Sequence, residues 1–121
     1  MELSGFEEHR NVIKAKTYTE VLNNILPAKD FAPGKDIAGK LDLTTVPTEI
    51  IRQIAKIRAY GIDKYKERDN WKKVDIKYYE QAIYRHWLNY ISGEENDNES
   101  GLKHLSHIAC NVAFILELEN E

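Results

Sequence analysis

The sequence predicts an all-α protein. We expect a small helical bundle built on an antiparallel helix pair, at about residues 75–91 and 98–118, with a helix at about 47–60 and an irregular N-terminal third. Three observations predict this. Apolar residues recur at intervals of three and four along each segment, and residues typical of helix ends bound them. The turn between the last two segments is short, which favours antiparallel packing. A length of 121 residues fits one domain, 1–121.

Composition favours a globular protein of the cytoplasm. Apolar residues make up 42% of the chain and charged residues 31%, which is unlike a disordered protein. A net charge of −3 gives no general attraction to nucleic acid or membranes, and no apolar run reaches the ~18 residues of a membrane span. The chain starts too polar for a signal peptide. A single cysteine, Cys110, excludes an intramolecular disulfide, and we expect it to be a buried small hydrophobe.

The first half of the chain predicts two helices separated by a loop. Tyr18–Leu26 is expected to form a short helix with Thr19 as its N-cap. Proline and glycine predict a loop over Asp30–Lys40. The helix at about 47–60 begins near Pro47, where a hydroxyl precedes the proline and an acid follows it. Gly61 is a natural residue to end this helix, and a polar connection with embedded aromatics follows over residues 62–73.

The two last helices have clear caps. Asp75 caps the first of them. Asp97 or Asn98 caps the second, and Glu99 falls in its first turn, where the helix dipole favours a carboxylate. The apolar positions of the last helix predict its core face, which consists of Leu102, Leu105, Ile108, Ala109, Val112, Ala113 and Leu116.

Polar side chains recur on one face of the last helix. His104, His107 and Asn111 are spaced by three and four residues and therefore share that face, with His86 opposite on the preceding helix. Polar groups near a core need hydrogen-bond partners or a bound species. A lone histidine there would be explained as a hydrogen-bonded core residue. Two on one face, near a third, favour a functional role.

The turn before the last helix is rich in acids. Glu94, Glu95, Asp97 and Glu99 would repel one another unless a cation lies among them. Mg²⁺ prefers such oxygen ligands together with water and phosphate oxygens. The plain alternative is that Asp97 and Glu99 only stabilise the helix start and that the other acids are solvated.

A basic segment precedes this acidic one. The segment from Arg52 to Lys77 contains nine Lys or Arg residues and four acids. The segment from Ser92 to Glu121 contains one lysine and seven acids. This contrast suits a phosphate-bearing ligand held beside a cation, or two opposite surfaces meeting in an oligomer. Lys64, Asn70 and Trp71 are residue types that contact phosphate or stack on a base. They serve equally well in a structural lid.

Several chemistries are excluded by their missing motifs. The sequence has no Gly-rich phosphate loop and no G-x-S-x-G elbow. It has no adjacent His-Asp pair of the kind found in metal-dependent phosphohydrolases, and no basic helix that would read a DNA groove.

The pattern resembles the N-terminal domain family of phage and bacterial dATP/dGTP diphosphohydrolases. The resemblance runs from about Lys40 to Leu118, so residues 41–118 are the family-like core and residues 1–40 a variable segment. The most specific part is the run G-E-x-x-D-x-E-S-G-x-x-H-x-x-H. The family commonly has glycine at Lys66 and proline at Asn98. The residues that carry the resemblance are Asp42, Leu43, Pro47, Tyr60, Gly61, Lys64, Tyr65, Asn70, Trp71, Lys72, Arg85, His86, Gly93, Glu94, Asp97, Glu99, Ser100, Gly101, His104, His107 and Asn111.

The resemblance implies a phage-encoded hydrolase of purine (deoxy)nucleoside triphosphates that uses a divalent metal. Similar all-α pyrophosphatases of the MazG-like group use two acidic pairs on facing helices. Glu94 and Asp97 match the second pair, but Glu80 has no acidic partner three or four residues away. The histidines are then expected to replace the missing carboxylates.

We therefore predict an enzyme that hydrolyses a nucleotide with Mg²⁺ or Mn²⁺ in the cytoplasm, as a homodimer or higher homo-oligomer. Glu94, Asp97 and Glu99 would bind the metal, and His104, His107 and Glu94 would be catalytic. The expected substrate-binding residues are Lys64, Asn70, Trp71, Arg85, His86 and Asn111. Two alternatives stay open: a phage protein that sequesters a host signalling nucleotide without hydrolysis, and a structural helical module.

Overall fold

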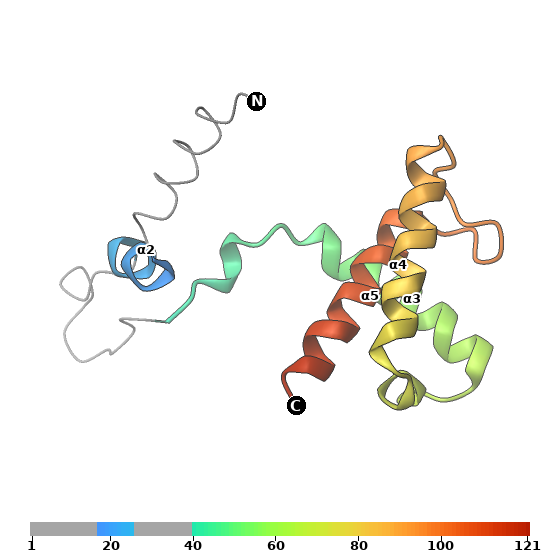
Figure 1. Ribbon diagram of the computed structural model, residues 1–121, viewed down its shortest axis with the longest axis horizontal. Helices are drawn as coiled ribbons and strands as arrows, with labels where there is room; N and C mark the ends of the chain where they lie inside the picture. The colour runs from blue at the N-terminus through green and yellow to red at the C-terminus, as the bar shows by residue number, and fades with distance from the viewer. Residues whose placement is uncertain (1–16, 26–39) are drawn as a thin grey trace, which may run out of the picture. The chain divides into compact units, whose positions relative to one another are not determined.

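A computed structural model describes residues 17–25 and 40–121 of the chain (Figure 1). The described residues belong to two units, Met1–Val46 and Pro47–Glu121, which we treat separately. In both units the described residues form helices and turns and contain no β-strand, so the predicted all-α class is confirmed. None of the helices described is both long and apolar enough to cross a membrane.

Among its described residues, the first unit has one α-helix and one 3₁₀ helix. Helix α2 (Tyr18–Ile25) forms where the sequence predicts it, but its cap is Thr17 rather than Thr19. The Glu20 backbone N–H donates to Thr17 Oγ1 over 3.2 Å, and the Thr17 N–H donates to the Glu20 carboxylate over 3.2 Å. This reciprocal pair is a capping box, which explains the earlier start. The 3₁₀ helix η2 (Leu43–Thr45) follows Asp42. The predicted loop Asp30–Lys40 lies outside the described residues, except for Lys40.

Helix α3 (Glu49–Tyr65) opens the second unit and is longer than predicted. The prediction that Gly61 ends this helix is wrong, because Gly61 lies inside it. Glycine in a helix interior costs only about 1 kcal/mol relative to alanine, so tertiary contacts beyond it can extend the helix. One such contact is Lys64 Nζ to the Glu99 carboxylate, at 2.5 Å. The helix ends at Lys66, which adopts the left-handed conformation with φ +56°.

The segment after α3 is more regular than the predicted polar connection. It contains the 3₁₀ helix η3 (Asn70–Lys73), whose Trp71 stacks on Phe114 with ring centroids 4.6 Å apart. The Tyr79 hydroxyl donates to the Trp71 carbonyl over 2.6 Å. The Arg58 guanidinium donates to the carbonyl of Arg68. These contacts fix the segment against the helices, so its conformation is determined by packing.

Helices α4 (Ile76–Ile91) and α5 (His104–Glu119) form the predicted antiparallel pair, shown side by side in Figure 1. His86 meets His104 near one end of the pair, and Tyr79 meets Phe114 further along, so the two chain directions are opposite. Asp75 caps α4 by accepting a hydrogen bond from the Lys77 N–H, as the sequence predicts. The start of α4 is therefore a local property of the chain.

The predicted start of α5 at residue 98 is wrong, because the helix begins at His104. Residues 97–102 form a tight turn, closed by a hydrogen bond from the Asp97 N–H to the Leu102 carbonyl over 2.8 Å. Gly101 has φ +73°, a conformation incompatible with a continuous right-handed helix. Asp97 therefore caps this turn, through the Ser100 N–H at 2.9 Å, and Glu99 lies outside the helix.

The predicted core face of α5 is right only in part, because Leu102, Ile108, Ala109 and Ala113 are half-buried but the other three residues are exposed. Leu105 is 43% exposed, Val112 40% and Leu116 62%. The fully buried residues of this helix are instead two polar ones, His104 and Ser106, together with Cys110. His104 and Ser106 face the neighbouring helices, because His104 forms a hydrogen bond with His86 and Ser106 forms one with Gln53. Burial also raises the pKa of the Cys110 thiol to about 11, which agrees with the predicted hydrophobic role.

Candidate functional site

A cavity of about 510 Å³ opens between α3, η3, α4 and α5. This volume lies in the range of small-molecule binding sites. Nine of the eleven residues predicted for the functional site line the cavity. They are Lys64, Asn70, Trp71, Arg85, His86, Asp97, Glu99, His107 and Asn111. Of the remaining two, His104 lies behind His86 and Glu94 lies beside His104.

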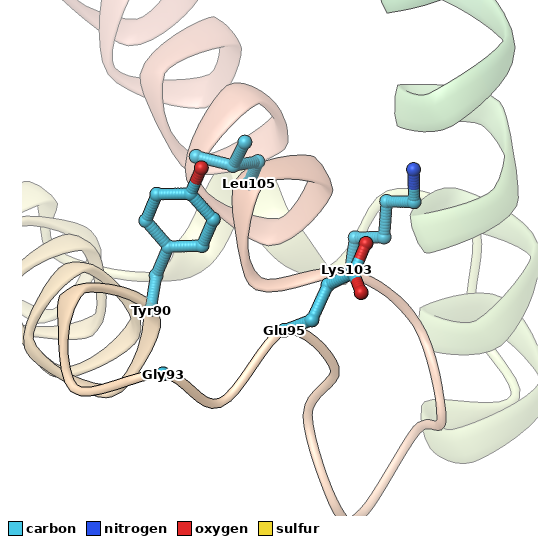
Figure 2. Close-up of a pocket in the computed structure, with 5 residues that line it drawn as sticks. All are labelled: Tyr90, Gly93, Glu95, Lys103 and Leu105. Carbon is cyan, nitrogen blue, oxygen red and sulfur yellow. The ribbon is translucent and has the colours of Figure 1, made fainter.

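A second hollow, of about 430 Å³, lies at the connection between α4 and α5 (Figure 2). Tyr90 of α4 and Leu105 of α5 stand close together on one side of it, and Glu95 and Lys103 come from the connecting loop. The residues that line it include no imidazole, so the groups suited to catalysis lie in the larger cavity.

Three histidines form one cluster at the larger cavity. His86 of α4 lies with its Nδ1 atom 2.8 Å from Nδ1 of His104, so one ring donates a hydrogen bond to the other. The His86 ring also stacks on His107, with centroids 4.4 Å apart and planes within 6°. Tyr60 meets the edge of the His107 ring at 6.3 Å. The three-residue spacing on α5 places both of its histidines against the same partner on α4.

His86 and His107 are held in their neutral form. Burial lowers the pKa of His86 to about 4, and repulsion from a charged His107 contributes in the same direction. Burial also lowers the pKa of His107, and the nearby Asp97 carboxylate opposes this only in part. A neutral imidazole has a free lone pair, so at neutral pH these rings can accept a proton or bind a metal ion.

Asp97 is an ionised carboxylate that lines the cavity. Burial alone would raise the pKa of this carboxyl group, but hydrogen bonds from Ser100 outweigh it and the net pKa is lowered. The Ser100 hydroxyl lies 2.7 Å from Nε2 of His107, and that nitrogen is 3.9 Å from Asp97 Oδ2. Sequence reasoning did not single out Ser100 as a site residue. Its position three residues after Asp97, in the E-S-G turn, is the signal that could have identified it.

The three acids predicted as metal ligands point to different partners. Glu99 pairs with Lys64, and hydrogen bonds from Lys64 and Tyr60 lower the pKa of Glu99. Glu94 Oε1 lies 3.4 Å from His104 Nε2. Among the described residues, the group whose ligand atoms converge within 4.8 Å is instead His86, Asp97 and His104.

Cationic and aromatic side chains also line the cavity. Arg85 and Lys64 line the cavity beside Asn70. Phe114 covers one face of Trp71, and the Arg58 guanidinium lies 5.9 Å from the centroid of the Trp71 ring. Lys72 Nζ lies 5.8 Å from the same centroid, and a base cannot stack on the face that Phe114 covers. Sequence reasoning missed Arg58, which reaches η3 from α3.

Fold and site together define a small helical domain with a cavity that combines cations, neutral imidazoles and a carboxylate. The chain belongs to the family described as "dATP/dGTP diphosphohydrolase, N-terminal", whose model matches residues 32–121. This confirms the family suggested by the sequence. One relative, a "dATP/dGTP diphosphohydrolase" of Salmonella phage PMBT28, is 33% identical over 82 residues, or 68% of this chain. The chain spans 28% of that relative's length. No solved structure matches this chain.

Proposed function

We propose that the cavity between α3 and α5 binds a purine (deoxy)nucleoside triphosphate and hydrolyses it with a divalent metal ion, Mg²⁺ or Mn²⁺. The observation that carries this proposal is the gathering of nine predicted site residues around one cavity of nucleotide size. The name of the phage relative supports the same substrate class. The reaction would take place in the host cytoplasm, where nucleotide substrates are dissolved.

The cations of the cavity would recognise the phosphates. Arg85 can bind phosphate oxygens through two parallel hydrogen bonds, and Lys64 adds a point charge. Lys64 is paired with Glu99 in the structure, so a triphosphate would compete with that carboxylate. Releasing Glu99 would free it to take part in binding the metal beside Asp97. Asn70, Asn111 and Trp71 would contact the sugar or the base.

The histidines would handle the proton of the attacking water. His107 lines the cavity, is neutral at pH 7 and lies near Asp97, so it can act as a general base toward a water held by the metal. His104 is buried behind His86 and does not line the cavity. It would support the site through its Nδ1 atom, which lies beside that of His86, and Glu94 would orient its ring.

A second candidate is nucleotide binding without turnover, as in a protein that sequesters a host signalling nucleotide. The observation that favours it is the 28% coverage of the relative, whose named activity can depend on the part this chain lacks. Binding requires the cations and aromatics of the cavity but no metal-held water. A purely structural module would bind no nucleotide.

The proposal includes a homodimer or higher oligomer. Large apolar side chains on α4 and α5 remain exposed, and such surfaces on soluble proteins mark interaction sites. These side chains are Tyr78, Tyr84, Trp87, Leu88, Ile91, Leu105, Val112 and Leu116.

A nucleotide panel tests the proposal directly. The purified chain is mixed with dATP, dGTP, ATP, GTP and pyrimidine triphosphates, with and without Mg²⁺ or Mn²⁺. Thermal shift and phosphate or pyrophosphate release are then measured. We expect purine triphosphates to stabilise the fold and to be hydrolysed only with metal. Stabilisation without hydrolysis would favour sequestration, and the absence of both would leave the structural module.

A pair of arginine variants localises the binding. Arg85→Gln removes a cation that lines the cavity, whereas Arg52→Gln removes one paired with Glu49 on the exposed side of α3. A charge-assisted hydrogen bond contributes about 1.5–3 kcal/mol, so we expect Arg85→Gln to weaken triphosphate binding by about 10- to 100-fold. Arg52→Gln should bind as the parent does. Equal effects of the two substitutions would contradict the proposed site.

A further inference from the structure

We propose that His86, His104 and Asp97 bind one divalent transition-metal ion of the nitrogen-preferring kind, such as Zn²⁺, in preference to Mg²⁺. The inference rests on the proposed function in one respect, because it assigns the metal of the same cavity. It replaces three carboxylates with two imidazoles and one carboxylate as the protein ligands. This changes the class of ion that the site selects.

The first support is the convergence of the ligand atoms. One nitrogen from each histidine and one oxygen from Asp97 lie within 4.8 Å of one another. The two Nδ1 atoms are 2.8 Å apart. Ligand nitrogens lie about 2.0–2.1 Å from zinc, so two of them on one ion are separated by about 3.0–3.4 Å. The rings would therefore need to move apart by only a few tenths of an ångström, which small side-chain rotations allow.

The second support is an unpartnered nitrogen. His104 has 0% of its surface exposed, and its Nε2 atom has no hydrogen-bond partner among the described residues. A buried polar atom without a partner costs about 1–3 kcal/mol. Glu94 Oε1 lies close by, 3.4 Å from this nitrogen.

A metal on the other nitrogen explains this arrangement. When Nδ1 of His104 binds an ion, its proton is fixed on Nε2 and can be donated to Glu94. Metal-binding histidines usually donate their second ring N–H to a carboxylate in this way. Glu94 would then be a positioning residue that orients the ring, and its carboxylate needs to approach by less than 1 Å to make a normal hydrogen bond.

The charges of the surrounding groups also suit this ion. Two neutral imidazoles and one ionised aspartate carry a charge of −1 toward a dication, and Glu94 adds a second negative charge just behind them. Arg85 and His107 also face His86.

Imidazole ligands suit Zn²⁺ and its neighbours, whereas Mg²⁺ prefers oxygen ligands in octahedral geometry. His86 and Asp97 line the cavity, so the open coordination positions would face it. Three protein ligands with an open position are typical of a catalytic metal site.

Metal titration in the absence of nucleotide tests the inference. The full chain is stripped with a chelator and titrated with Zn²⁺, Co²⁺ and Mg²⁺ in a calorimeter. We expect one Zn²⁺ per chain, a visible Co²⁺ spectrum from nitrogen ligation, and at least 100-fold weaker binding of Mg²⁺. Equal affinity for Mg²⁺, or no Zn²⁺ binding by the folded parent chain, would overturn the proposal.

Four variants separate the ligands from their surroundings. His86→Gln and Asp97→Asn should each weaken Zn²⁺ binding by about 100-fold or more, and Glu94→Gln by about tenfold. Asp63→Asn changes an exposed carboxylate of α3 and is the matched control for Asp97→Asn, so it should bind Zn²⁺ as the parent does. Unchanged binding in His86→Gln would overturn the assignment.

A second measurement does not depend on variants that fold. Nitrogen NMR of the parent chain reports which ring nitrogens bind the metal. We expect the Nδ1 signals of His86 and His104 to shift on addition of Zn²⁺. Signals that keep their metal-free tautomers would show an imidazole pair joined only by a hydrogen bond, and would refute the site.

The failure of this inference is distinguishable from that of the proposed function. Zn²⁺ binding without nucleotide hydrolysis would leave the metal site intact and contradict the hydrolase. Hydrolysis by the His86→Gln variant with Mg²⁺ at the parent rate would contradict the metal site and leave the hydrolase function intact.

Discussion

The protein is expected to lose stability as the pH falls from 6.5 to 4, and His86 is the main cause. Burial lowers the pKa of His86 from 6.5 to about 4, so the folded protein binds this proton more weakly than the unfolded chain does. A lowered folded-state pKa contributes stability that is fully present above the unfolded pKa. That contribution is lost as the pH falls through the window between the two values.

The expected magnitude follows from the size of the shift. One pKa unit corresponds to 1.36 kcal/mol, so the interval from 6.5 to about 4 corresponds to about 3 kcal/mol, and partial exposure of the ring reduces this to about 2 kcal/mol. Domains of this size are stable by only about 5–15 kcal/mol, so the change is measurable. His107 adds to the loss, because its pKa is lowered as well. The cause in both cases is burial of an imidazole among groups that do not favour its charge.

Urea denaturation of the metal-stripped chain at pH 7, 6, 5 and 4 measures this dependence. His86→Gln removes the titrating group and keeps a side chain able to donate to His104, so its stability should fall less steeply below pH 6.5. Gln81→Ala changes an exposed residue of the same helix that does not titrate, and it is the matched control. If the parent and His86→Gln lose stability with the same slope, the burial argument for His86 is refuted.

Two further predictions concern the helix end and the exposed apolar surface. Lys66 adopts φ +56°, which costs an L-residue about 1–2 kcal/mol, so Lys66→Gly should raise the free energy of unfolding by about 0.5–1 kcal/mol despite losing the exposed ion pair with Asp63. Chemical denaturation checks this, and destabilisation would contradict it. The chain should sediment as a dimer or larger oligomer at micromolar concentration, and Leu116→Glu should shift it toward monomer. A parent chain that is monomeric at every concentration would exclude the proposed oligomer.

Local signals were enough to predict several elements of the fold. Asp75 caps α4 through the Lys77 N–H, a bond that depends on residues two apart in the sequence. The antiparallel packing of α4 and α5 was predicted from a short connection, and it holds although the connection spans residues 92–103 in the structure. The positive φ of Lys66 marks a position where glycine would be the residue typical of a helix end.

Other features depend on contacts between distant parts of the chain. Gly61 carries a local signal to end a helix, but Lys64 reaches Glu99, 35 residues away, and the helix continues past the glycine. Ser106 is buried because its hydroxyl donates to Gln53 of α3 over 2.6 Å. A periodicity argument counts it as polar and places it outside. Neither partner could be identified from spacing along the sequence.

The sequence predicted which residues belong to the candidate site better than it predicted which of them contact one another. The helical spacing of His104, His107 and Asn111 correctly indicates that they share a face, and the cavity includes two of them. The acids of the connecting turn look equivalent in sequence. The turn from Asp97 to Leu102 separates them, sending Glu99 to Lys64 and Glu94 to His104.

The exposed leucines of α5 have a consequence for how this helix chooses its orientation. Leu105, Val112 and Leu116 lie on the far side of the helix from the buried Cys110, roughly 140° around it at about 100° per residue. Rotating α5 by that angle would bury the leucines and expose the histidines, so hydrophobic burial alone favours a competing rotational state. The hydrogen bonds of His104 and Ser106 oppose that rotation. A ligand bound to the histidines would oppose it further, and would thereby select one packing of the bundle over its competitor.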